Sequence, residues 1–283
     1  MKVSVTFRRQ LLRAKITITG LFIVSTRRSH RTMGKSPSLI GGRFLCAGYL
    51  CWMLLLVFTN SANAQVAPLR ILPLGDSITF GLGAPGGYRA PLFDVLTAQG
   101  YQVDFVGTQT SNAAEGQSER EHEGHSGWQI DQILGISESV LAEIDDPDVV
   151  LLLIGTNDFS NNNDTQNAIH RLENLVRTLA NLSPSSHIVL SNLTERAGPL
   201  NTQIQTQFNS LVPGLVDTLS GEGMAVHFID LYSAVPLADM PDGLHPDLNG
   251  YTKMAAAWAS HITAIFGPNG AYDMPPKVLR ANA

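Results

Sequence analysis

The run Val149–Ile154 constrains the fold more than any other segment of the sequence. All six of its residues are apolar, and Gly155 follows at once. A short apolar run without polar alternation is typical of a strand that is buried on both faces. Such a strand needs helices on both sides of its sheet. The run therefore predicts a parallel sheet in the interior of an α/β domain.

Strand-like and helix-like segments alternate along the rest of the chain. We expect further strands at Leu69–Leu74, Gln102–Val106, His187–Leu190 and Ala225–Ile229. We expect helices at Pro91–Gln99, Trp128–Ile144, a segment capped by Asp164, Asn201–Leu219 and Asn249–Phe266. The polar segment Thr108–His125 is interpreted as a surface loop. This order predicts a three-layer α/β/α sandwich around a flavodoxin-like, five-stranded parallel sheet.

The first 64 residues differ sharply in charge from the rest of the chain. They hold ten of the 19 lysines and arginines and none of the 24 acids, so residues 65–283 carry a formal net charge of −15. Phosphate binding needs clustered basic side chains, so we expect no nucleic-acid partner and no stable contact with anionic membranes. An anionic polymer such as pectin should also be repelled, especially at low salt. The alternative is that the acidity serves only solubility.

The leader resembles a signal peptide. The uncharged run Phe44–Phe58 is followed by small residues up to Ala64, after which we expect cleavage. Residues 1–32 are interpreted as a mis-start ahead of Met33, and residues 33–64 as the signal peptide. The run is shorter than the about 20 residues of a membrane span, but an uncleaved anchor stays an alternative. We therefore expect secretion or a periplasmic location, with a catalytic domain over residues 65–267 and a short tail over residues 268–283.

Four polar clusters are expected to meet at one edge of the sheet. Gly75-Asp76-Ser77 follows the first strand, and Gly155-Thr156-Asn157-Asp158 follows the third. Asp242-Gly243-Leu244-His245 comes after the fifth strand, and Gly124-His125-Ser126-Gly127 precedes the second long helix. Ligand sites in such sheets lie beyond the carboxyl ends of the strands. Ser, His and Asp side chains gathered there favour acyl transfer by an activated nucleophile.

In order and spacing, these clusters resemble the SGNH (GDSL-type) hydrolases. The stretches DFVGTQ, GHSGW and DGLHPDLNGY resemble more narrowly carbohydrate esterase family 3, the acetylxylan esterases. The resemblance covers roughly Leu69–Phe266 and implies a serine esterase that needs no cofactor.

The same resemblance implies a role for each site residue. Ser77 would be the nucleophile, His245 the general base, and Asp242 the carboxylate that orients the imidazole. The oxyanion hole would consist of the backbone N–H groups of Ser77 and Gly127 and the side-chain amide of Asn157.

Each of these residues also has a simpler interpretation when taken alone. Ser77 could cap a helix, His245 could be a surface histidine, and Asn157 could bond its own turn. Asp76 and Asp158 are interpreted as structural. Trp128 is more readily an anchor for its helix than a platform for a sugar ring. The spacing of His122-Glu123-Gly124-His125 does not match a zinc protease helix, so we expect no catalytic metal.

Three functions are compatible with the sequence. The first is an exported serine esterase that removes O-acetyl groups from a polysaccharide such as xylan. The second is a lipase-like or arylesterase member of the same superfamily that acts on small or lipid esters. The third is a carbohydrate-binding domain with a vestigial site, although the complete set of clusters argues against it. In each case we expect a monomer.

Overall fold

A computed structural model of the chain describes residues 67–268. The predicted leader, with its cleavage site and both cysteines, lies outside the described residues, as does the predicted tail apart from Pro268. Among residues 67–268, no helix is both long enough and apolar enough to cross a membrane.

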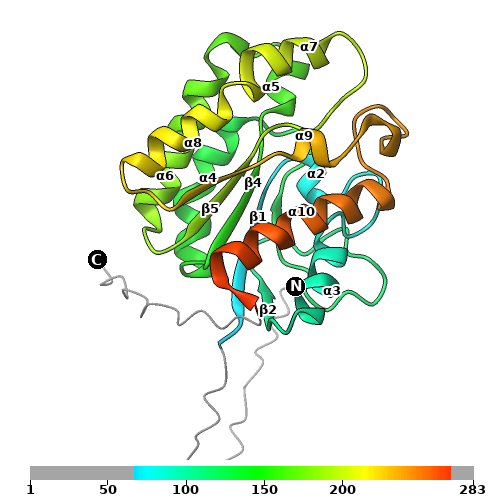
Figure 1. Cartoon of the computed structure of the whole chain (residues 1–283), viewed down its shortest axis with the longest axis vertical. Coiled ribbons are helices and arrows are strands. Elements are labelled where there is room, and N and C mark those ends of the chain that lie inside the picture. Colours follow the sequence, from blue (N-terminus) through cyan, green and yellow to red (C-terminus); the bar gives the residue numbers. More distant parts are fainter. Residues whose placement is uncertain (1–66, 269–283) are drawn as a thin grey trace, which may run out of the picture. The chain divides into compact units, whose positions relative to one another are not determined.

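A parallel six-stranded sheet lies at the centre of the described residues (Figure 1). The strands are β1 (Leu69–Gly75), β2 (Val103–Phe105), β3 (Glu123–Gly124), β4 (Val149–Leu153), β5 (His187–Ser191) and β6 (Val226–Ile229). Their order is β2-β1-β4-β5-β6, and β3 pairs with β1 off this path. Without the two-residue β3, this is the strand order of a flavodoxin-like sheet, so the predicted fold class is confirmed.

The predicted surface loop Thr108–His125 is wrong at its carboxyl end, because that end forms β3. Glu123 lies opposite Leu74 of β1, and Gly124 lies opposite Gly75. Glu123 is fully buried together with His122, which precedes it. A two-residue strand is too short to leave a periodic pattern in the sequence.

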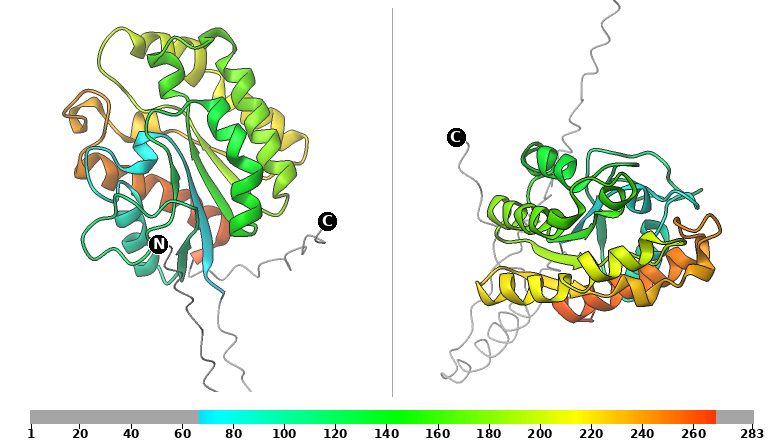
Figure 2. Two further views of the ribbon diagram at one scale, coloured as in Figure 1. Left: turned by 180° about the vertical axis from the view of Figure 1, so that it is seen from behind. Right: turned by 90° about the horizontal axis from the view of Figure 1, so that it is seen from above.

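Helices cover both faces of the sheet (Figures 1 and 2). The longer helices are α3 (Arg89–Ala98), α4 (Ile130–Ile144), α6 (Ala168–Leu182), α8 (Val212–Gly221) and α10 (Leu248–Phe266). The short ones are α2 (Ser77–Phe80), α5 (Thr156–Ser160), α7 (Leu200–Ile204) and α9 (Leu231–Ala234). Helices α4 and α6 pack side by side on one face, and α3 packs against α10 on the other. This arrangement confirms the predicted three layers.

The apolar side chains of α6 show how each helix joins the core. Its fully or nearly fully buried residues recur at helical spacing, namely Ala168, Leu172, Leu175, Val176 and Leu179. Side chains at this spacing share one face of a helix, which here faces α4 and the sheet. The β4 residues beneath are all buried, as the apolar run predicts.

The predicted helical segment Asn201–Leu219 is confirmed, although the turn residues Ser210 and Leu211 interrupt it. Between α7 and α8 lies a π-helical turn, Gln205–Asn209. The Asn209 side chain points inward, accepting a hydrogen bond from the Leu193 N–H (2.9 Å) and donating one to the Leu193 carbonyl (2.8 Å). Pro213 then stands in the first turn of α8, where its missing N–H costs no intrahelical bond.

The prediction that Asp164 caps the next helix is also wrong. A 3₁₀ turn, Thr165–Asn167, comes first, and α6 begins at Ala168. The Asp164 carboxylate accepts hydrogen bonds from the side-chain amide of Asn167 at 2.9 and 3.1 Å. It therefore caps no backbone N–H of the helix.

The burial pattern predicts how two leucines differ in their contribution to stability. Leu172 is fully buried between α6 and its neighbours, whereas Leu248 is 62% exposed. Leu172→Ala should lower the free energy of unfolding by about 2–5 kcal/mol, since it leaves a cavity in the core. Leu248→Ala should change it by less than about 1 kcal/mol. Urea unfolding followed by circular dichroism measures both, and equal losses would contradict the assigned core.

Candidate active site

The end of β1 fixes the position of Ser77. A Cβ atom on Gly75 would lie 2.0 Å from the carbonyl oxygen of Leu153, so only glycine lets β1 approach β4 this closely. The next residue, Asp76, is the N-cap of α2, and its Oδ1 accepts a hydrogen bond from the Ile78 N–H at 3.0 Å. Ser77 is therefore the first residue of a short helix that starts at the carboxyl edge of the sheet.

The structure brings Ser77, His245 and Asp242 together in one hydrogen-bonded chain. Ser77 Oγ lies 3.0 Å from His245 Nε2, and His245 Nδ1 lies 2.7 Å from Asp242 Oδ2. Because an ionised carboxylate can only accept hydrogen bonds, Nδ1 carries a proton and donates a hydrogen bond to Asp242. Nε2 is then left to accept the proton of the Ser77 hydroxyl. This is the geometry of a nucleophile, a general base and an orienting carboxylate.

Asp242 keeps its negative charge although its own segment partly covers it. Partial burial raises the pKa of this carboxyl, but hydrogen bonds from His245 and from the Leu244 N–H outweigh it, and the pKa falls to about 2. Oδ1 accepts the backbone N–H groups of His245 at 2.7 Å and Leu244 at 2.9 Å. The turn therefore aligns the carboxylate with the imidazole and favours the charged form of the carboxylate.

The turn that follows β3 brings Gly127 to the site. The His125 N–H donates to the Gly75 carbonyl at 2.9 Å, which ties the turn to the end of β1. Gly127 is exposed and has a φ of +84°, a backbone conformation that favours glycine. Within residues 67–268, the N–H groups of Ser77 and Gly127 donate no hydrogen bond. Two backbone donors are thus available to a ligand beside Ser77.

Asn157, the third predicted oxyanion donor, already uses both of its amide protons. It lies in α5, just after β4, and Nδ2 donates to the Trp128 carbonyl at 3.0 Å and to Asp76 Oδ2 at 3.3 Å. The amide therefore bridges the Gly127 turn and the segment that carries Ser77. It does not bond its own turn. The contact with Asp76 is long for a hydrogen bond, so it is the one that a substrate oxygen exchanges at least cost.

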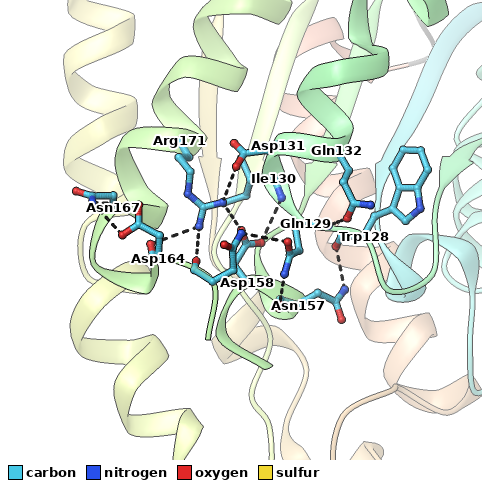
Figure 3. A network of polar contacts seen from close by, with 11 residues as sticks. Trp128, Gln129, Ile130, Asp131, Gln132, Asn157, Asp158, Asp164, Asn167 and Arg171 are labelled. Carbon is cyan, nitrogen blue, oxygen red and sulfur yellow. Dashed lines mark hydrogen bonds and ion pairs between the residues drawn. The ribbon is translucent and has the colours of Figure 1, made fainter. Parts of the chain in front are cut away.

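A largely buried ion pair at Asp158 holds the start of α5 against the start of α4 (Figure 3). Arg171 of α6 donates to Asp158 Oδ1 at 2.6 Å, and Asp158 Oδ2 accepts the Ile130 N–H at the start of α4 at 3.2 Å. Next to this pair, the Gln129 side chain donates to the Asn157 carbonyl at 3.3 Å. Burial raises the pKa of Asp158, and Arg171 opposes that shift. Asp158 thus has the structural position that the sequence analysis expects of it.

Asp76 is a buried carboxyl beside the nucleophile. It is fully inaccessible to solvent, and burial raises its pKa to about 7, assisted by the charge of Asp158 and opposed by the hydrogen bond from Ile78. Its two oxygens bond different partners, because Oδ1 caps α2 and Oδ2 accepts from Asn157. One carboxyl therefore sets the orientation of both the nucleophile helix and the Asn157 amide.

The polar side chains of His122–His125 bond within their own neighbourhood. His125 Nε2 lies 2.7 Å from Glu123 Oε2, and the His125 ring stacks on Trp128 with centroids 4.0 Å apart. His122 Nδ1 accepts the Gly124 N–H at 3.0 Å. The stacked residues flank the turn that contains Gly127. Trp128 is partly buried, as an anchor for α4 requires.

Two supporting contacts were not predicted from the sequence. One is the Asp158–Arg171 pair described above. The other is Asp239, which accepts Asn249 Nδ2 at 2.7 Å and Lys253 Nζ at 2.5 Å and so fixes the His245 loop to α10. The partners lie on different elements. No local spacing in the sequence indicates that such residues will meet.

The chain resembles known esterases over the whole of this site. The GDSL-like lipase/acylhydrolase family model matches residues 74–253. A family 3 carbohydrate esterase from Clostridium thermocellum is 32% identical, with a TM-score of 0.64 over 70% of this chain and 97% of that one. A family 3 carbohydrate esterase from Talaromyces cellulolyticus shares the fold at 22% identity, with a TM-score of 0.59 over 70% of this chain and 97% of that one.

A longer relative matches the same region. The multidomain esterase of Ruminococcus flavefaciens is 32% identical over 228 residues, which are 71% of this chain but 29% of that protein's length. The chain belongs to the GDSL-like lipase/acylhydrolase family, and within it resembles the family 3 carbohydrate esterases. It is an ester hydrolase with an α/β fold.

The buried Asp76 carboxyl predicts a distinctive pH dependence of stability. In the folded chain it holds its proton up to about pH 7, against an ordinary pKa of 3.8, so folding takes up a proton between these values. The native state therefore loses stability as the pH rises from about 4 to about 7. Asp76→Asn cannot ionise but keeps a capping side chain. Its stability relative to the wild type should rise with pH over this range, by up to about 4 kcal/mol.

Urea unfolding of both proteins at pH 4.5 and pH 8 measures this difference. Asp94→Asn removes the same charge from an exposed position on α3 and serves as the control. If the difference in the free energy of unfolding between the wild type and Asp76→Asn stays constant with pH, Asp76 ionises normally in the folded chain.

Proposed function

We propose that the chain is an exported serine esterase that removes O-acetyl groups from a polysaccharide such as xylan, through an acyl-enzyme on Ser77. The observation that carries the proposal is the hydrogen-bonded chain of Ser77, His245 and Asp242 beside two backbone donors that have no partner in the described part of the chain. The likeness to a family 3 carbohydrate esterase supports a sugar ester as substrate. The signal-like leader of residues 33–64 supports export.

The first half of the reaction uses the Ser77–His245 contact. As Ser77 Oγ attacks the acetyl carbonyl carbon, its proton passes to His245 Nε2 across the 3.0 Å hydrogen bond. The new imidazolium is stabilised by Asp242, which stays ionised because its pKa is about 2. The carbonyl oxygen becomes an oxyanion and accepts the N–H groups of Ser77 and Gly127. When the tetrahedral intermediate collapses, His245 returns the proton to the departing sugar hydroxyl, and the acetyl group stays on Ser77.

The second half repeats these steps with water. His245 takes a proton from a water molecule, which attacks the acetyl-enzyme carbonyl and forms a second tetrahedral intermediate. Its collapse breaks the bond to Ser77 Oγ, and His245 returns the proton to that oxygen. Acetic acid leaves and gives its proton to solvent water to become acetate, and the enzyme is restored.

Asn157 contributes a third donor in both intermediates. In the free enzyme its Nδ2 donates a hydrogen bond to Asp76 Oδ2 at 3.3 Å, and the developing oxyanion accepts this hydrogen bond instead while the bond to the Trp128 carbonyl is kept. The exchange costs little in the ground state, whereas a bond to a full negative charge is strong. The donor therefore acts mainly in the transition state, which is where binding accelerates the reaction.

A lipase-like or arylesterase function is the second candidate, and one observation favours it. Leu82 and Leu248 are exposed to 43% and 62%, and both lie near the His245 loop. A Cβ atom on Gly83, beside Leu82, would lie 3.4 Å from the Cβ of His245, while Leu248 follows His245 by three residues. These side chains could contact the acyl chain of a longer ester.

Replacing Ser77 tests the proposed nucleophile and substrate together. Ser77→Ala should lower acetate release from acetylated xylan by about a thousandfold or more, since within residues 67–268 no other hydroxyl is hydrogen-bonded to His245. Enzymatic detection of acetate, with circular dichroism to confirm folding, gives the result. Unchanged acetate release by Ser77→Ala would exclude the proposed nucleophile. A wild-type preference for octanoyl over acetyl aryl esters would favour the lipase-like alternative.

Removing the Asn157 amide should lower kcat more than it changes KM. Asn157→Ala is expected to reduce kcat by about 10²–10³-fold, because one oxyanion donor is typically worth that much. Steady-state kinetics on 4-nitrophenyl acetate measures the split between the two constants. If KM alone rises and kcat is unchanged, Asn157 contacts the ground-state substrate and is not an oxyanion donor.

A further inference from the structure

The turn that carries Gly127 has an exposed tip with few neighbours. The Trp128 N–H donates to the His125 carbonyl at 3.1 Å, which closes a four-residue turn with Ser126 and Gly127 at its centre. Both central residues are exposed. A Cβ atom on Gly127 would meet no other atom of the described residues within 4 Å, apart from its chain neighbours. The direction of the Gly127 N–H therefore depends on how the two ends of the turn are held.

Backbone contacts tie each end of the turn to a different part of the site. The His125 N–H donates to the Gly75 carbonyl at 2.9 Å, two residues before Ser77. At the other end, the Trp128 carbonyl accepts the Asn157 amide at 3.0 Å (Figure 3). Each bond fixes one end of the turn to its neighbour. The tip between them also depends on how the two ends are held against each other.

The side chains of His125 and Trp128 join the two ends directly. Their rings stack with centroids 4.0 Å apart and an angle of 15° between the ring planes. Because these residues are the first and last of the turn, the stack bridges the segment that contains Gly127. Aromatic rings in contact add stability beyond the area that they bury. The stack therefore opposes a twist of the turn that would redirect the Gly127 N–H.

The Glu123 carboxylate holds the imidazole in this stack. Its side chain is fully inaccessible to solvent, and Oε2 lies 2.7 Å from His125 Nε2, while Oε1 accepts the Thr108 N–H. Burial raises the pKa of Glu123, but the hydrogen bonds from His125 and Thr108 outweigh it, and the pKa lies below its usual value. An ionised carboxylate can only accept hydrogen bonds, so Nε2 carries a proton and donates to Glu123. A group in the core thus sets the orientation of the His125 ring.

We propose that His125, oriented by Glu123 and stacked on Trp128, is the positioning residue that directs the Gly127 N–H toward the oxyanion. This role rests on the proposed function, in which the Gly127 donor acts in the tetrahedral intermediates. Without the stack, the turn loses the alignment of this donor in the transition state but leaves ester binding as before. Loss of the stack should therefore lower kcat and leave KM unchanged.

Two variants of His125 separate the ring stack from the hydrogen bond to Glu123. His125→Gln keeps an N–H donor for Glu123 but has no ring, whereas His125→Phe keeps a ring but has no donor. On 4-nitrophenyl acetate, kcat per active site should fall about tenfold in His125→Gln, which is less than the complete loss of an oxyanion donor costs. His125→Phe should stay within about threefold of the wild type, since the stack is retained. Titration with a fluorophosphonate gives the number of active sites.

A thionoester shows whether the loss arises at the oxyanion. In this substrate sulfur replaces the carbonyl oxygen of 4-nitrophenyl acetate, and sulfur is a weak hydrogen-bond acceptor, so a misaligned donor costs it little. The ratio of kcat/KM for the oxygen ester to that for the thionoester should fall about tenfold in His125→Gln, because only the oxygen ester loses a strong hydrogen bond. His125→Phe should keep the wild-type ratio. The ratio does not depend on how much of the protein is folded.

His170→Gln is the matched control. It makes the same replacement at an exposed position on α6 and should change neither kcat nor the substrate ratio. A wild-type ratio in His125→Gln would overturn the proposal. Equal falls of the ratio in His125→Gln and His125→Phe would overturn it as well, because the ring would then not be the part that matters.

Ser77→Ala, measured on the same two esters, tests the proposed function separately. If it hydrolyses the oxygen ester as fast as the wild type does, the proposed nucleophile fails, and the positioning role of His125 fails with it. If Ser77→Ala is inactive while His125→Gln keeps the wild-type ratio, only the positioning role fails.

Discussion

The close approach of β1 to β4 at Gly75 is the constraint on which the site depends. Any side chain at this position would collide with the Leu153 carbonyl, so the two strands can end side by side only if residue 75 is glycine. As a result, the residues that follow β1 and those that follow β4 emerge together, with Ser77 in one segment and Asn157 in the other. The β3 strand pairs with the same end of β1 and brings the Gly127 turn to the same place. The backbone therefore assembles three of the four site segments before any side chain contributes.

The polar contacts beneath the site lower the stability of the fold but fix the orientation of the groups in the site. Asp76 is buried where its charge is unfavourable, yet its two oxygens hold α2 and the Asn157 amide. Asp158 is buried as well, and Arg171 offsets part of that cost. Carboxyl groups in such positions fix the geometry of donors and nucleophile before a substrate arrives. An apolar core of the same volume would hold the fold but would not orient the Asn157 amide.

The sequence alone predicts the layers of the fold and the residues that meet at its edge. The apolar run Val149–Ile154 predicts the buried strand, and the clusters around Ser77, Asn157 and His245 follow strands, where ligands bind. The features that the sequence does not predict are either elements too short to leave a pattern or contacts between residues that lie far apart in the chain. The strand β3 has two residues, and the π-helical turn depends on an Asn209 side chain that bonds Leu193. The Asp158–Arg171 pair exists only once α5 and α6 have packed.

The central claim is that Ser77 is the nucleophile, activated by His245. Labelling with a fluorophosphonate, followed by peptide mass spectrometry, tests it directly, because the reagent forms a covalent adduct with an activated serine. The account predicts one adduct per chain, on Ser77, which forms in parallel with the loss of esterase activity. An adduct on the neighbouring Ser126, or complete inactivation with Ser77 unmodified, would contradict it.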